Sequence, residues 1–131
     1  MLAEDFAERF DGFSVGSNDL TQLTLGVDRD SEALVHVFDE TNPAVTRSIQ
    51  SLVPRAQSVG RTVGLCGRRP SDDPAFTEFL VKSGIDSISV APDSFAVVKQ
   101  HAAAAELNLH GEGRTAPPGT RQPQAGLSSS D

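Results

Sequence analysis

The stretch Gly60-Arg-Thr-Val-Gly-Leu-Cys-Gly67 decides the fold class of this chain. Its centre, residues 62–66, is a short apolar run bounded by glycines, which predicts a strand. A helix signal comes before it, because Asn42-Pro43 supplies an N-cap with an N1 proline and Gly60 supplies a stop. A second helix signal begins after it at Asp73-Pro74. A strand between two helices is typical of a parallel α/β unit.

The same alternation extends outward from this strand in both directions. The predicted elements are a helix near residues 2–10, a strand at 13–16, a helix at 43–59, a strand at 62–66, a helix at 73–84, a strand at 85–90 and a helix at 93–106. A long connection separates the first strand from the helix that follows it. This order predicts three parallel strands with right-handed crossovers. So narrow a sheet needs both faces covered, or closure into a barrel.

Length, charge and composition exclude several classes of protein. The chain has 131 residues and a net charge of −7, with no Trp or Tyr. This balance argues against a nucleic-acid partner, which needs dense Lys and Arg or stacking aromatic residues. No run approaches the ~18 apolar residues of a membrane span, and the N-terminus has no apolar signal core. A single cysteine fits a reducing compartment, so we expect a cytoplasmic protein.

Composition also divides the chain into a domain and a tail. Residues 1–106 carry all the helix and strand signals, whereas residues 107–131 are rich in Gly, Pro and Ser. Such a segment buries too little apolar surface to offset its ordering entropy, so we expect a disordered tail. Residues 1–40 hold ten acidic residues and two arginines, which indicates either a cation site or a solvated face.

Functional residues of parallel α/β folds cluster where the strands end. The first strand runs into Ser17-Asn18-Asp19, where backbone amides can approach an anion and the Asp19 carboxylate offers an oxygen to Mg²⁺. The alternative is that these side chains simply cap a helix. Pro92-Asp-Ser94 follows the third strand and reads as a turn and helix cap, with no catalytic role.

The second strand ends at Cys66, which two arginines follow closely. Nearby positive charge favours the thiolate, a group that exchanges protons near neutral pH. The alternative is a small buried hydrophobic residue. Arg68 and Arg69 are suited to hold a phosphate or a carboxylate, or else to keep the surface soluble. The three histidines have no metal-ligand spacing to one another or to Cys66.

Several motifs together resemble the phosphoenolpyruvate-utilising enzymes. The clearest is Phe13-Ser-Val-Gly-Ser-Asn-Asp-Leu-Thr-Gln22, which is similar to a signature of that family. Three further stretches resemble its synthase branch (pyruvate, water dikinase): residues 25–31, residues 63–72 with Cys-Gly and Pro-Ser-Asp, and residues 84–93. The sequence Phe38-Asp-Glu with Asn42-Pro-Ala-Val45 agrees. The resemblance covers about residues 1–106 in the correct order.

This resemblance implies a fold, a reaction and a set of roles. The corresponding region closes a (β/α)₈ barrel that binds pyruvate and phosphoenolpyruvate, so we expect a partial barrel holding its last three strands. Asp19 is implied as a Mg²⁺ ligand, with Ser17 and Asn18 holding substrate beside the metal. Cys66 is implied to exchange a proton with the methyl or methylene carbon, while Mg²⁺ polarises the keto oxygen.

Two departures from the family pattern bear on activity. Synthase relatives usually carry Gln after Cys-Gly, whereas this chain has Arg68, which favours the thiolate and alters the pocket. A complete barrel takes ~250 residues, so we expect the chain alone to be inactive and to need a second chain or self-association. The alternative to a catalytic fragment is a non-catalytic remnant or a small α/β module that binds a partner or an anion.

Overall fold

The computed structural model of the chain describes residues 2–28 and 30–112. Three strands, β1 (Gly12–Gly16), β2 (Thr62–Cys66) and β3 (Ser87–Ser89), form one parallel sheet in the order β1-β2-β3. The predicted parallel α/β architecture is therefore confirmed. The register places the last residues of the strands, Gly16, Cys66 and Ser89, side by side at one edge.

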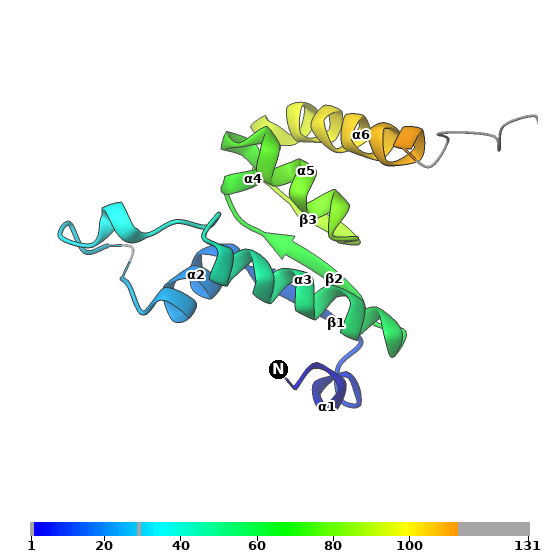
Figure 1. Cartoon of the computed structure of the whole chain (residues 1–131), viewed down its shortest axis with the longest axis horizontal. Helices are drawn as coiled ribbons and strands as arrows, with labels where there is room; N and C mark the ends of the chain where they lie inside the picture. The colour runs from blue at the N-terminus through cyan, green and yellow to red at the C-terminus, as the bar shows by residue number, and fades with distance from the viewer. Residues whose placement is uncertain (1, 29, 113–131) are drawn as a thin grey trace, which may run out of the picture.

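Helices flank these strands (Figure 1). The longer ones are α1 (Ala3–Ala7), α2 (Ser17–Leu25), α3 (Pro43–Ser58), α5 (Pro74–Lys82) and α6 (Phe95–Glu112). The short ones are α4 (Arg69–Asp72) and two 3₁₀ turns at Val35–Val37 and Pro92–Ser94. In Figure 1, α3 runs beside β1 and β2, while α5 lies between β3 and the outer helix α6.

Alternation along each strand gives the sheet one covered face and one open face. On the covered face, β1 and β2 pack against α3 and α5 through the buried cluster Val15, Ile49, Val53, Ala56, Val63, Leu65, Phe76 and Leu80. The alternate positions carry small or polar residues: Gly12, Ser14, Gly16, Thr62, Gly64, Cys66, Ser87 and Ser89. Parallel sheets are normally buried on both faces, so this open face calls for a cover.

The predicted ends of α3 and α5 are confirmed by their caps. Asn42 Oδ1 accepts a hydrogen bond from the Ala44 amide at 2.9 Å, and Asp73 Oδ1 accepts one from the Ala75 amide at 3.0 Å. Each such cap typically contributes about 1 kcal/mol. Gly60 follows α3 and has a φ of 74°, a conformation that glycine adopts without steric cost.

Several elements differ from the prediction. The expected long connection contains α2, whose Ser, Asn and Thr residues have weak helix propensity; burial of Ser17 and Thr21 stabilises it instead. β3 is shorter than expected. α6 continues to residue 112, past the predicted domain end at 106, because its alanines and leucines favour helix. The rest of the predicted disordered tail, residues 113–131, lies outside the described residues.

Large apolar side chains in and next to helix α1 are exposed to solvent. Leu2, Phe6 and Phe10 are 63%, 52% and 57% exposed, whereas Ala3 and Ala7 are buried. Helix α1 ends at Ala7, short of the predicted residue 10, so of these three residues only Phe6 lies within it. None of the described helices is long and apolar enough to cross a bilayer.

Candidate functional site

A cavity of about 490 Å³ lies where the three strands end. Its lining comes from all three strand ends and the turns after them: Gly16, Asn18, Asp19, Cys66, Gly67, Arg68, Ser89, Val90 and Ala91. The sheet register brings these segments together, because Gly16, Cys66 and Ser89 are neighbours across the strands. Parallel α/β folds bind ligands at this edge of the sheet, so the cavity is the candidate site.

Helix α2 places Asn18 and Asp19 in the cavity wall. The N-cap of α2 is Gly16, which has no side chain to cap with, and residues 17–19 form the first turn. The alternative that Ser17, Asn18 or Asp19 acts as the side-chain cap is therefore wrong. Asp19 Oδ2 lies 3.1 Å from the point that a Cβ on Gly16 would occupy, so the glycine leaves room for the carboxylate. The first turn of a helix also favours a negative charge.

Ser17 lies beneath the cavity and not in its wall. Its side chain is completely buried, and Thr21 Oγ1 donates a hydrogen bond to its carbonyl oxygen at 2.8 Å. Its hydroxyl has no hydrogen-bond partner within residues 2–28 and 30–112. The hydroxyl stands against Gly67, at the place where a Cβ of that residue would be. Ser17 therefore supports the turn that carries Cys66.

Cys66 and Arg68 both reach the cavity. The Cys66 thiol is exposed and belongs to the open face of the sheet, so it is not the buried hydrophobic residue of the alternative interpretation. Arg68 follows two residues later in the same wall. The cavity therefore brings together a thiol, a guanidinium and the Asp19 carboxylate, which come from two different strand ends.

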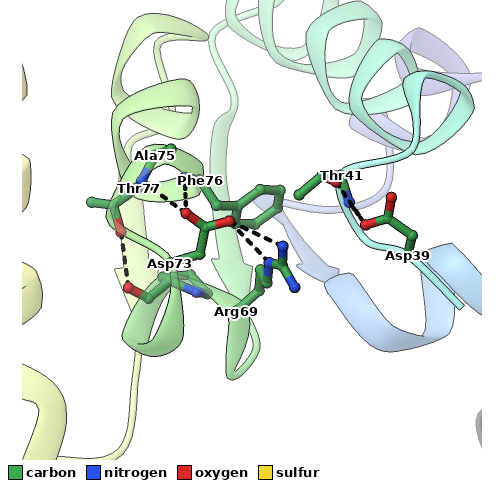
Figure 2. Close-up of polar contacts among 8 residues, drawn as sticks. Asp39, Thr41, Arg69, Asp73, Ala75, Phe76 and Thr77 are labelled. Carbon is green, nitrogen blue, oxygen red and sulfur yellow. Dashed lines mark hydrogen bonds and ion pairs between the residues drawn. The ribbon is translucent and has the colours of Figure 1, made fainter. Parts of the chain in front are cut away.

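Arg69 has a structural contact instead of a place in the cavity. Its Nη2 lies 3.0 Å from Asp73 Oδ2, and the same aspartate caps α5 (Figure 2). Thr77 Oγ1 donates to the Pro70 carbonyl at 3.0 Å and fixes the turn from the other side. The two arginines, which the sequence does not distinguish, thus differ in role.

Sequence reasoning missed the third wall of the cavity. Ser89, Val90 and Ala91 follow β3 and complete the lining, although only the turn at residues 92–94 drew attention in the sequence. The sequence could have indicated this wall, because the rule that functional residues follow the strand ends applies to β3 as it does to β1 and β2.

The donors in the cavity fit part of the shell of a hard cation. Asp19 supplies a carboxylate and Asn18 an amide oxygen, the ligand types that Mg²⁺ prefers, with waters or substrate in its other positions. No group of three or more His, Cys, Asp or Glu residues gathers anywhere in the described ranges. These two donors are fewer than a Mg²⁺ ion takes, so they fit only part of its shell.

The connection before α3 runs close to this region. Asp39 Oδ1 accepts hydrogen bonds from the Thr41 hydroxyl at 2.6 Å and the Thr41 amide at 2.8 Å (Figure 2). The hydrogen bond from the Thr41 hydroxyl lowers the pKa of Asp39. Partial burial of the carboxylate opposes this shift, whereas the Thr41 amide and the charge of Arg69 add to it. The next residue, Glu40, is buried with its Oε1 near Gly67.

Comparison with known proteins gives the family. Residues 1–107 match the family described as PEP-utilising enzyme, PEP-binding domain. The chain is 57% identical to the phosphoenolpyruvate synthase of Aquifex aeolicus over 107 residues, which is 82% of this chain. It is 58% identical to that of a Synechocystis strain over 94 residues, or 72% of this chain.

The match occupies a small part of those relatives. The aligned region is 12% of the length of both the Aquifex aeolicus and the Synechocystis proteins. The family match nevertheless includes every strand and every residue of the cavity wall. The chain therefore belongs to the family of PEP-utilising enzymes, with residues 1–107 in its PEP-binding domain.

Proposed function

We propose that this chain supplies the pyruvate- and phosphoenolpyruvate-binding edge of a (β/α)₈ barrel in a phosphoenolpyruvate synthase. The reaction of such a synthase converts ATP, pyruvate and water to phosphoenolpyruvate, AMP and phosphate through a phosphohistidine. The observation that carries the proposal is the row Gly16, Cys66 and Ser89, with Asp19 and Arg68 around one cavity. It has the elements needed for an anionic three-carbon acid, a cation and a proton carrier.

Arg68 and the first turn of α2 hold the anionic groups of the substrate. Arg68 supplies a guanidinium that pairs with a carboxylate or a phosphate. The start of α2 borders the same cavity, where the N-terminal amides of a helix favour an anion, and Asn18 adds a side-chain donor. Because the Ser17 hydroxyl is buried, Ser17 contributes through its backbone.

Asp19 and Cys66 carry the chemical roles. Asp19, with Asn18, would hold Mg²⁺, which supplies Lewis-acid charge at the keto oxygen of the substrate. The Cys66 thiolate takes a proton from the methyl carbon of pyruvate, and in the reverse direction the thiol returns it to the methylene carbon. Exposure of the thiol in the cavity wall supports this role.

The open face of the sheet supports the barrel. It carries small and polar residues, and both outer strands lack a partner on one side in the described part of the chain. In the proposed assembly the earlier strands of the barrel cover this face, supplied by a second chain or by further sequence; self-association is the alternative. The 131-residue chain alone is then inactive. Its single exposed thiol fits a reducing cytoplasm.

Alkylation of the single cysteine tests the proposed site. The full chain is treated with iodoacetamide at fixed pH, with and without phosphoenolpyruvate and Mg²⁺. We expect the ligand to slow alkylation of Cys66, and Asp19→Asn to remove most of that protection. Asp93→Asn is the matched control, because Asp93 follows β3 yet lies outside the cavity wall. Equal alkylation rates with and without ligand, up to millimolar concentration, would rule the site out for this chain.

A binding module without proton transfer is the second candidate function. Arg68, in place of the glutamine usual in the family, adds a cation to the cavity and favours anion binding. Exchange of the pyruvate methyl protons in D₂O, followed by proton NMR with the complementing barrel segments present, separates the two functions. Exchange that Cys66→Ala abolishes supports catalysis, whereas protection without exchange supports the binding module.

A further inference from the structure

Two buried oxygens near Gly67 have no hydrogen-bond partner in the described part of the chain. They are Glu40 Oε1 and Ser17 Oγ, on side chains that are 9% and 0% exposed. No protein group within residues 2–28 and 30–112 bonds to either atom. Buried polar atoms are normally paired with protein or with ordered water, so two of them close together indicate a missing bridging partner.

Both atoms lie against the same glycine. Ser17 Oγ stands where a Cβ of Gly67 would be, and Glu40 Oε1 lies 3.9 Å from that position. The two oxygens are therefore within the span of one bridging water. One is a hydroxyl that can donate and the other is a carboxylate oxygen that can accept.

The three residues belong to three different segments. Ser17 begins α2, Glu40 lies in the connection before α3, and Gly67 follows Cys66 at the end of β2. A link between Ser17 and Glu40 ties the first two segments together on the side of Gly67 away from the cavity. The backbone of the Cys66–Arg68 turn then packs against side chains that are held in place.

We infer that Glu40 is a positioning residue of this site. Its carboxylate holds the Ser17 hydroxyl through one buried water, and this hydrogen-bonded pair fixes the turn that carries Cys66 and Arg68. Glu40 is absent from the cavity wall, so its side chain does not border a ligand bound there. The role is independent of which ligand the cavity binds, so it stands or falls separately from the proposed function.

A double-mutant cycle in the full chain tests the link. Ser17→Ala and Glu40→Leu each lower the folding constant about tenfold, and the double variant lowers it little further, because either change breaks the same link. Glu40→Gln keeps an acceptor oxygen and stays within about threefold of the parent. Glu32→Leu, at an exposed acidic residue of the same connection, is the control and shows no coupling to Ser17→Ala. Additive losses, about a hundredfold in the double variant, would overturn the inference.

Amide hydrogen exchange separates positioning from general stability. In Ser17→Ala we expect exchange of the amides at residues 66–69 and 71 to rise about tenfold more than that of the core amides of α3. A uniform rise across the whole domain would contradict a positioning role.

A carbon-13 measurement tests the link directly without a substitution at Glu40, in case Glu40→Leu does not fold. The carbon-13 shift of the Glu40 carboxyl carbon should move in Ser17→Ala and not in Ser14→Ala, whose side chain is exposed on the open face. An unmoved Glu40 resonance would refute the link.

Discussion

Gly67→Ala is expected to destabilise the chain through a single contact. A Cβ at this position would fall on Ser17 Oγ and come within 3.1 Å of Ser17 Cβ. Ser17 is completely buried and begins a helix, so it has no open space into which to move. Overpacking of this kind costs about 1–3 kcal/mol. The folding constant should therefore fall by a factor of about 5 to 150.

Urea unfolding followed by circular dichroism measures this loss. In a Ser17→Gly background, which lacks both clashing atoms, Gly67→Ala should cost at most half of the free energy that it costs in the parent. Gly111→Ala is the control, because a Cβ there meets nothing within 4 Å and the position is helical; its free energy of unfolding should stay equal or rise by up to about 1 kcal/mol. A Gly67→Ala variant within about 0.5 kcal/mol of the parent would refute the packing argument.

Four further predictions concern the core, a helix cap, pH dependence and activity. Ile49→Ala, at a fully buried position, should cost about 2–5 kcal/mol of unfolding free energy, and a loss under 1 would mean that the cluster is not the core. Asp73→Ala should cost about 1–2 kcal/mol by thermal or urea unfolding, because it removes the cap of α5 and an ion pair. The hydrogen bond from the Thr41 hydroxyl lowers the pKa of Asp39 in the folded chain. The resulting stabilisation is complete above the ordinary aspartate pKa near 4, and it is lost as the pH falls through the lower pKa of the folded state. Between about pH 5 and 2, the midpoint of unfolding should therefore fall less steeply in Thr41→Val than in the parent chain; equal slopes would contradict this. The isolated chain should make no phosphoenolpyruvate from ATP and pyruvate, and product that disappears in Cys66→Ala would overturn that expectation.

Local signals in the sequence predicted most of the sheet and its two main helices. Asn42 and Asp73 cap their helices as their residue types predict, since a cap depends on a few adjacent residues. Helix α2 was indicated only through the alternative that residues 17–19 cap a helix, because its stability comes from burial of Ser17 and Thr21, which is a tertiary effect.

The cavity was predictable in part for the same reason. The strand-end rule identified Asp19 and Cys66, and the structure places both in the lining of one cavity. The difference between Arg68 and Arg69 was not predictable, because it depends on which guanidinium reaches Asp73 after the chain has turned. Burial of Glu40 beside Gly67 joins residues far apart in sequence and leaves no local pattern.

The separate positions of the two arginines have a consequence for how ligand preference can change. Arg69 is tied to Asp73 and so to the start of α5, whereas Arg68 lies in the cavity wall without forming part of that cap. Substitution at residue 68 can therefore alter the charge offered to a ligand while the turn keeps its shape. A single-codon change could then adjust the pocket toward a different acid without first requiring a compensating change in the fold.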